Sequence, residues 1–151
     1  MTDDPTKDQL ALGLGSLIMG VGFGGAAMTA SQIILSLFGY RFEPTGYYVL
    51  TAGLIAAVGV GGTCGWYRSF DLDNIWQRGV IAVLGAVGAV LVGFLAAVVE
   101  RFLGVAGMIV WLVISIVFGI AGRRWALKGK GKGEVGRGTG TTQIWQFKDS
   151  C

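Results

Sequence analysis

The longest apolar run in the chain, Gly79 to Gly122, limits how the rest can fold. Its forty-four residues contain only two charges, the adjacent Glu100 and Arg101. As a single helix the run would be about 65 Å long at roughly 1.5 Å per residue, whereas the hydrocarbon core of a bilayer is about 30 Å thick. It would also hold its charged pair at mid-span, where an arginine costs roughly 2.5 to 3.5 kcal/mol. The run therefore predicts a transmembrane helical hairpin with Glu100–Arg101 at its tip.

Glu100 has two interpretations. The favoured one is a solvated turn residue paired with Arg101 at the tip of the hairpin. The alternative is a carboxylate inside the membrane, which requires the hairpin to turn elsewhere, for instance at Gly104–Gly107.

Composition supports a membrane protein. Hydrophobic residues make up 53% of the chain and charged residues only 14%, against about 25% charged in soluble domains. The chain has 27 glycines and two prolines. Glycine inside apolar runs is typical of membrane helices whose backbones approach closely.

The sequence predicts an all-α, polytopic integral membrane protein with four transmembrane helices and short loops. The transmembrane domain is expected to cover residues 1–125, and Asp71 or Asp73 is expected to cap the third span. Residues 126–151 are expected to form a basic, Gly-rich cytoplasmic tail that is partly flexible. The four spans are expected at about 10–37, 47–66, 79–99 and 102–122.

Four spans place both termini on one side of the membrane, and the basic residues are divided unequally between the two sides. Ten lie on the face of the termini and two, Arg41 and Arg101, on the other. By the positive-inside rule the termini are cytoplasmic, and a prokaryotic inner or plasma membrane is expected. The ten are Lys7, Arg68, Arg78, Arg123, Arg124, Lys128, Lys130, Lys132, Arg137 and Lys148.

Small residues recur every four positions in three of the spans, which places each set on one helix face. The favoured interpretation is packing within the bundle, and the alternative is that the groove on the third span docks a partner helix or a second copy. The sets are Ser16, Gly20 and Gly24; Gly53, Ala57, Gly61 and Gly65; and Gly85, Ala89, Gly93 and Ala97.

Residues suited to catalysis are scarce. The chain has no histidine, which is the commonest general base and metal ligand. Hydroxyl residues within the spans are expected to bond to their own backbone or to a neighbouring helix. Trp111, midway along the fourth span, is interpreted as core packing, with a lipid-facing ring or a pigment contact as alternatives. We therefore expect no enzyme activity, no cofactor and no metal site.

The end of the fourth span carries a basic cluster that is expected to contact anionic lipid head groups. Further along the tail, Trp145 in the segment Thr141–Phe147 is expected to contact the membrane interface or a partner. Nucleic-acid binding is not expected, because proximity to the membrane already explains the charge. The cluster is Arg123, Arg124, Lys128, Lys130 and Lys132.

The sequence contains many small residues suited to close helix packing and few residues suited to catalysis. The leading hypothesis is therefore a non-catalytic structural, assembly or accessory subunit that packs against another membrane protein or its own copies. The alternative is a small oligomeric transporter or channel for an ion or small solute.

Overall fold

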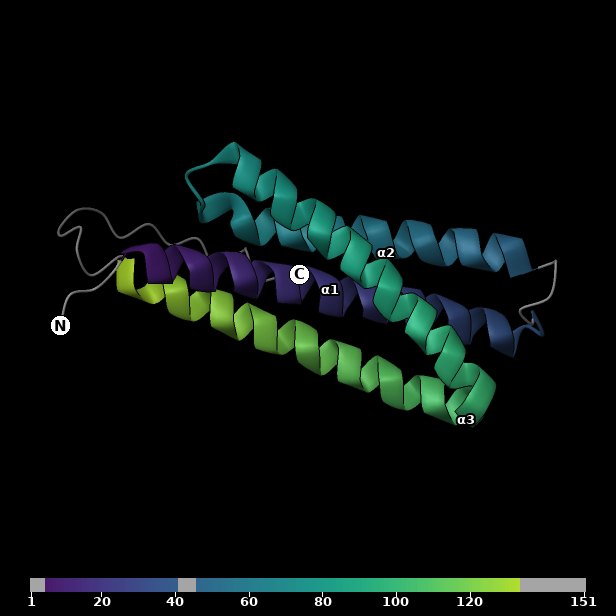
Figure 1. Cartoon of the computed structure of the whole chain (residues 1–151). Helices are drawn as coiled ribbons and strands as arrows, with labels where there is room; N and C mark the ends of the chain where they lie inside the picture. The colour runs from purple at the N-terminus through teal and green to yellow at the C-terminus, as the bar shows by residue number, and fades with distance from the viewer. Residues whose placement is uncertain (1–4, 41–45, 134–151) are drawn as a thin grey trace, which may run out of the picture.

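A computed structural model describes residues 5–40 and 46–133 of the chain. It contains three α-helices, α1 (Pro5–Leu37), α2 (Gly46–Arg68) and α3 (Ile75–Gly133), with a 3-10 helix η1 (Ser69–Asp71) before α3. All three α-helices are long and apolar enough to cross a membrane. They lie side by side in an elongated bundle (Figure 1). The all-α prediction is confirmed for the described ranges, in which no strand occurs.

α3 is 59 residues long, but it is not straight. Gly104 has φ 66° and ψ −162°, a region of backbone conformation that is essentially restricted to glycine. At this residue the helix folds back on itself (Figure 1). We call residues 75–103 the proximal half of α3 and residues 105–133 its distal half.

Contacts with α1 give the direction of each half. Along α1 and the proximal half, the residue numbers of contacting residues increase in the same direction, so these two segments are parallel. Along α1 and the distal half they run in opposite directions, so those segments are antiparallel. The contacts are Gly13 with Ile81 and Gly25 with Val92 before the bend, and Gly15 with Ala126 and Gly22 with Gly119 after it.

The predicted hairpin tip is wrong. Glu100 and Arg101 are both helical, and the chain reverses three residues later at Gly104. Glutamate and arginine are good helix formers, whereas Gly104 adopts the positive φ that the reversal requires. As a result the predicted third and fourth spans fall in the two halves of α3, which are separated by the non-helical backbone of Gly104.

α3 continues beyond the predicted end of the last span, to Gly133. Residues 126–133 of the predicted tail are therefore helical. Residues 134–151, which include Trp145, lie outside the described residues.

Local hydrogen bonds define the ends of the helices. α1 ends in a Schellman motif, in which the Tyr40 N–H donates to Leu35 O at 3.1 Å and the Gly39 N–H donates to Ser36 O at 3.1 Å. Gly39 has the positive φ, 80°, that this motif requires.

The start of α3 is capped by Asn74, which is not one of the two predicted caps. The side-chain oxygen of Asn74 accepts a hydrogen bond from the Trp76 N–H at 3.0 Å. The expected caps, Asp71 and Asp73, lie earlier, in η1 and in the connection that follows it. Asn74 takes the role because it directly precedes the helix.

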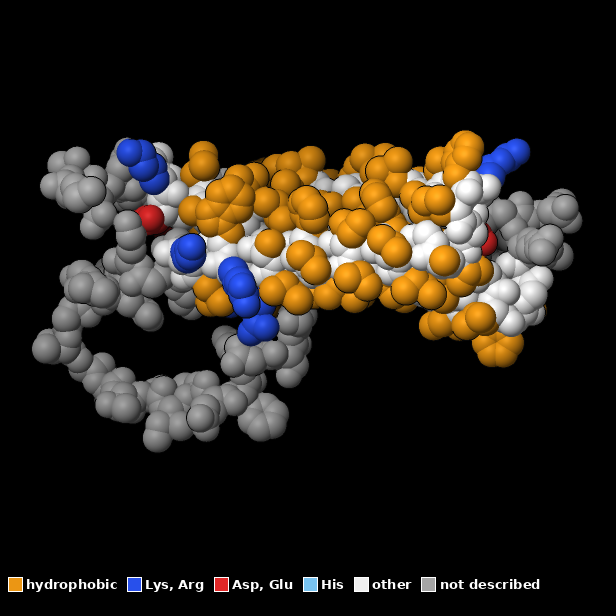
Figure 2. Space-filling model, turned by 90° about the horizontal axis from the view of Figure 1, so that it is seen from below, with side chains coloured by type: hydrophobic (Ala, Val, Ile, Leu, Met, Phe, Trp, Pro, Cys, Tyr) orange, Lys and Arg blue, Asp and Glu red, His pale blue; other side chains and the backbone are white. Residues whose placement is uncertain are grey.

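Side chains are distributed opposite to those of a soluble bundle. Alanine, glycine, serine and methionine make up most of the interior, and most of the large branched and aromatic residues are exposed or half-buried. Figure 2 shows hydrophobic side chains over the middle of one face, with lysine and arginine side chains toward the ends. α1 is the central helix, because half of the residues in its apolar 18-residue stretch are buried, against 28% in the corresponding stretch of α2 and 22% in that of α3.

Candidate functional site

The first feature of interest is a seam where α1, α2 and the proximal half of α3 meet. A Cβ atom placed on Gly24 of α1 would lie 2.4 Å from the Cβ of Ala89 and 2.8 Å from the carbonyl oxygen of Ala57. A Cβ atom placed on Gly61 of α2 would lie 3.1 Å from the carbonyl oxygen of Gly20 on α1 and 3.1 Å from that of Gly85 on α3. These distances leave no room for larger side chains, so three backbones touch along this line.

The small residues predicted to form packing grooves lie along this seam. Ten of the eleven are buried, and the eleventh, Ala97, is half-buried because its neighbour Ala96 takes the interior position. The groove on α3 therefore faces α1 and α2 of the same chain, where it is not accessible to a partner helix. The ten buried residues are Ser16, Gly20, Gly24, Gly53, Ala57, Gly61, Gly65, Gly85, Ala89 and Gly93.

A second seam joins α1 to the distal half of α3. A Cβ atom on Gly22 would lie 2.3 Å from the backbone nitrogen of Gly119, and one on Gly122 would lie 2.4 Å from the backbone nitrogen of Met19. A repeat of small residues every four positions does not reveal this seam, because on α3 its small residues follow steps of four, three and four. A search for small residues at either helical spacing would have found it. The α3 residues are Ser115, Gly119, Gly122 and Ala126, all buried.

Hydroxyl groups inside the bundle bond to their own helix. Ser16 donates to Leu12 O at 2.7 Å, and Thr29 donates to Gly25 O at 2.8 Å. Such bonds satisfy the hydroxyl groups locally and leave them with little capacity for a solute.

Two polar side chains instead connect helices or the two halves of α3. Gln32 of α1 is 2% exposed, and its amide nitrogen donates to Gly93 O of α3 at 3.4 Å. The amide oxygen of Gln32, Oε1, has no hydrogen-bond partner among the described residues. The Trp111 indole donates to Val92 O at 3.1 Å, which ties the distal half of α3 to the proximal half. The half-buried Trp111 thus has a packing contact within the chain.

Glu100 lies near an end of the bundle. The proximal half of α3 is about 43 Å long at roughly 1.5 Å per residue, which exceeds the 30 Å hydrocarbon core. Glu100 precedes the bend at Gly104 by about one helical turn, so the interpretation as a carboxylate inside the membrane is not favoured. Its predicted pairing with Arg101 is wrong, because consecutive residues on a helix do not face each other and these two form no ion pair.

The opposite end of the bundle carries the basic cluster. Arg123 is half-buried and Arg124 and Lys128 are exposed, all three on α3. Lys130 and Lys132 continue the same helix. The predicted contact of this cluster with anionic lipid head groups stays a prediction.

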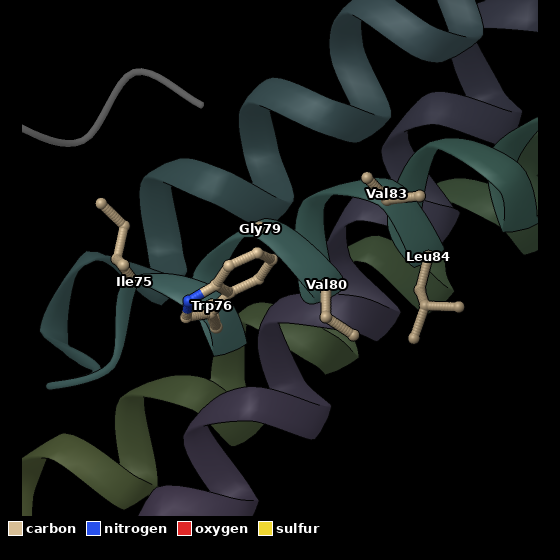
Figure 3. Close-up of a pocket in the computed structure, with 6 residues that line it drawn as sticks. All are labelled: Ile75, Trp76, Gly79, Val80, Val83 and Leu84. Atoms are coloured by element: carbon tan, nitrogen blue, oxygen red, sulfur yellow. The ribbon is translucent and has the colours of Figure 1, made fainter.

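The outer surface has two apolar grooves near this end. The α2–α3 groove has a volume of about 560 Å³ and runs between those two helices. The Trp76 groove, of about 580 Å³, lies on α3 alone. In Figure 3 the indole of Trp76 reaches toward Gly79, which has no side chain, and the remaining lining residues follow along the helix. Val83 belongs to both grooves, so they adjoin.

These features define a class of protein: an all-helical chain with three long apolar helices, compatible with a multi-pass membrane protein. No protein-family model, curated protein or solved structure matches the chain.

Proposed function

We propose that this protein is a non-catalytic, multi-pass integral membrane protein that serves as a structural, assembly or accessory subunit. The observation that carries the proposal is the placement of side chains: the interior is closed by backbone contacts between small residues, and the large apolar side chains point outward. A chain built in this way binds through its outer face.

Four passages through the membrane follow from the length of α3. Fifty-nine helical residues extend about 88 Å in total, almost three times the hydrocarbon thickness. The bend at Gly104 divides α3 into two antiparallel halves, each of spanning length. The charge bias of ten basic residues to two is unchanged by moving the turn from Glu100 to Gly104, and it supports cytoplasmic termini.

The accessory role is supported by the nature of the two seams. In both, glycine and alanine bring backbones into contact, and the hydroxyls of Ser16 and Thr29 bond locally. At these contacts the helix backbones lie too close together for a solute to pass between them. A partner membrane protein, or another copy, would bind the outer apolar surface of α2 and α3 and not the stripe from Gly85 to Ala97.

The proposal is tested by purifying a tagged protein in mild detergent. We expect other membrane proteins to co-purify in a fixed ratio. Gly59→Leu is the informative variant, because Gly59 lies on the outside of α2 and a Cβ atom placed on it would have no other atom within 4 Å. Gly79→Leu makes the same change at an open position on α3. A partner seated on α2 is lost from the first variant and retained by the second, and a partner seated on α3 gives the reverse. Retention by both variants would contradict a partner on these two positions of the outer surface.

A homo-oligomer that purifies without companions and conducts ions in liposomes would contradict the accessory role and support the transporter alternative. The orientation is tested separately. In a Cys64→Ser background, Cys151 is the single thiol, and a membrane-impermeant reagent is expected to label it only from the cytoplasmic side. Labelling from the outside alone would overturn the orientation.

A further inference from the structure

The α2–α3 groove arises because small residues separate larger ones on the two helices. A Cβ atom placed on Gly62 would meet only the Cβ of Ala86, at 4.0 Å, so the helices leave a furrow there. Aromatic residues close the groove at the end of α2. Its lining is Val58, Gly62, Thr63, Trp66, Tyr67, Phe70, Ala82, Val83 and Ala86.

The interior of the groove suits a hydrocarbon chain. Its one side-chain hydroxyl away from the aromatic end, that of Thr63, donates to Gly59 O at 2.5 Å and lies 3.2 Å from Val60 O, so it is committed to its own helix. From Val58 to Trp66 the α2 side of the groove extends about 12 Å along the helix at roughly 1.5 Å per residue. It therefore runs from the end of the bundle toward its middle, the direction in which a lipid tail enters a membrane.

A fixed cation lies beside the aromatic end of the groove, over one of its lining residues. The guanidinium of Arg78 lies 5.1 Å from the centre of the Phe70 ring, and the ring of Phe70 makes an edge contact with Trp66 at 6.4 Å. The Nε and Nη2 groups of Arg78 both donate to Leu72 O, which leaves the other N–H donors of the guanidinium for a ligand. Arg78 is half-buried and bonds to no carboxylate among the described residues, while Asp73 accepts from Gln9 of α1 at 3.4 Å.

We propose that the α2–α3 groove binds an anionic glycerophospholipid, with one acyl chain in the groove and the phosphate on Arg78. The adjoining Trp76 groove has room for the second chain on the other side of Val83 (Figure 3). An anionic head group is favoured over a zwitterionic one because the cation of the latter would be repelled by the guanidinium. The inference rests on the proposed membrane location and not on the accessory role.

Native mass spectrometry of the full-length protein in detergent tests this site, with phosphatidylglycerol and phosphatidylcholine as probes. We expect the wild-type protein to bind one phosphatidylglycerol more tightly than phosphatidylcholine. Arg78→Gln should weaken phosphatidylglycerol binding about tenfold, because it removes a charge-assisted contact with the phosphate. Gly62→Leu should weaken it at least as much by filling the groove.

Arg124→Gln is the matched control, since Arg124 is an exposed cation at the same end of the bundle and, unlike Arg78, does not lie over the Phe70 ring that lines the groove. We expect it to change phosphatidylglycerol binding less than twofold. Equal binding by Arg78→Gln and wild type would overturn the proposal. So would an equal loss in Arg124→Gln, or equal affinity for the two lipids. If Arg78→Gln does not fold, Gly62→Leu decides the question, because Gly62 makes no contact with Arg78 or Leu72.

Discussion

Replacing Gly22 with alanine tests whether backbone contact holds the second seam together. A Cβ atom at this position would lie 2.3 Å from the nitrogen and 2.6 Å from the Cα of Gly119, and 2.9 Å from the carbonyl oxygen of Ser115. All three atoms belong to the backbone of α3, which cannot rotate away as a side chain can. To restore a normal contact of 3.4 Å, the two helices must separate by about 1 Å.

The size of the effect follows from two opposing terms. Alanine is a better helix former than glycine by about 1 kcal/mol, which favours the variant. Overpacking costs about 1–3 kcal/mol, and a gap of about 1 Å forfeits up to half of the dispersion energy of the atom pairs along the seam. The first term is removed by comparison with Gly59→Ala, since Gly59 has no neighbour within 4 Å. We therefore expect Gly22→Ala to be about 1–3 kcal/mol less stable than Gly59→Ala, roughly a 5- to 150-fold change in the unfolding equilibrium.

The assay is reversible unfolding in mixed micelles with increasing sodium dodecyl sulfate, followed by circular dichroism. Gly59→Ala should unfold at or above the wild-type midpoint, and Gly22→Ala should unfold below Gly59→Ala and at or below the wild-type midpoint. If the two variants unfold at the same midpoint, α1 and the distal half of α3 do not pack by backbone contact, and the reasoning is refuted.

Three further predictions use the same assay. Gly104→Ala should destabilise the protein by about 1–3 kcal/mol through backbone strain alone, because no atom lies within 4 Å of its Cβ position, and an unchanged midpoint would contradict a bend at this residue. Gln32→Met should be neutral or stabilising, because it removes a buried oxygen without a partner at the loss of one long hydrogen bond, whereas a loss above about 2 kcal/mol would show that the amide is fully bonded. Gly93→Ala should be destabilising because its Cβ would lie 2.0 Å from the sulfur of Met28, and a double-mutant cycle with Met28→Ala should give a coupling of about 1 kcal/mol or more, in contrast to the additive behaviour of separated sites.

The grooves of the first seam could be predicted from sequence because their small residues repeat at one helical spacing. The second seam could not be found by a fixed interval of four, because Ser115, Gly119, Gly122 and Ala126 follow the helix face in unequal steps. The α2–α3 groove was not predicted because it depends on two residues 24 positions apart, Gly62 and Ala86, lying opposite each other. Arg78 appeared in the sequence only as one basic residue among ten, and its place beside Phe70 is set by the connection between α2 and α3.

Composition and run length were sufficient to determine an all-helical chain with helices long and apolar enough to cross a membrane, because a bilayer requires long uncharged helices with internally bonded backbones. They also required Gly79–Gly122 to reverse, since no straight helix of that length fits. The position of the reversal depended on backbone conformation: Glu100 and Arg101 remain helical, and Gly104 adopts the positive φ. Only the tertiary structure decided what covers the glycine–alanine stripe of the proximal half of α3. It faces α1 and α2 of the same chain, because backbone contact among three helices buries small residues most closely there.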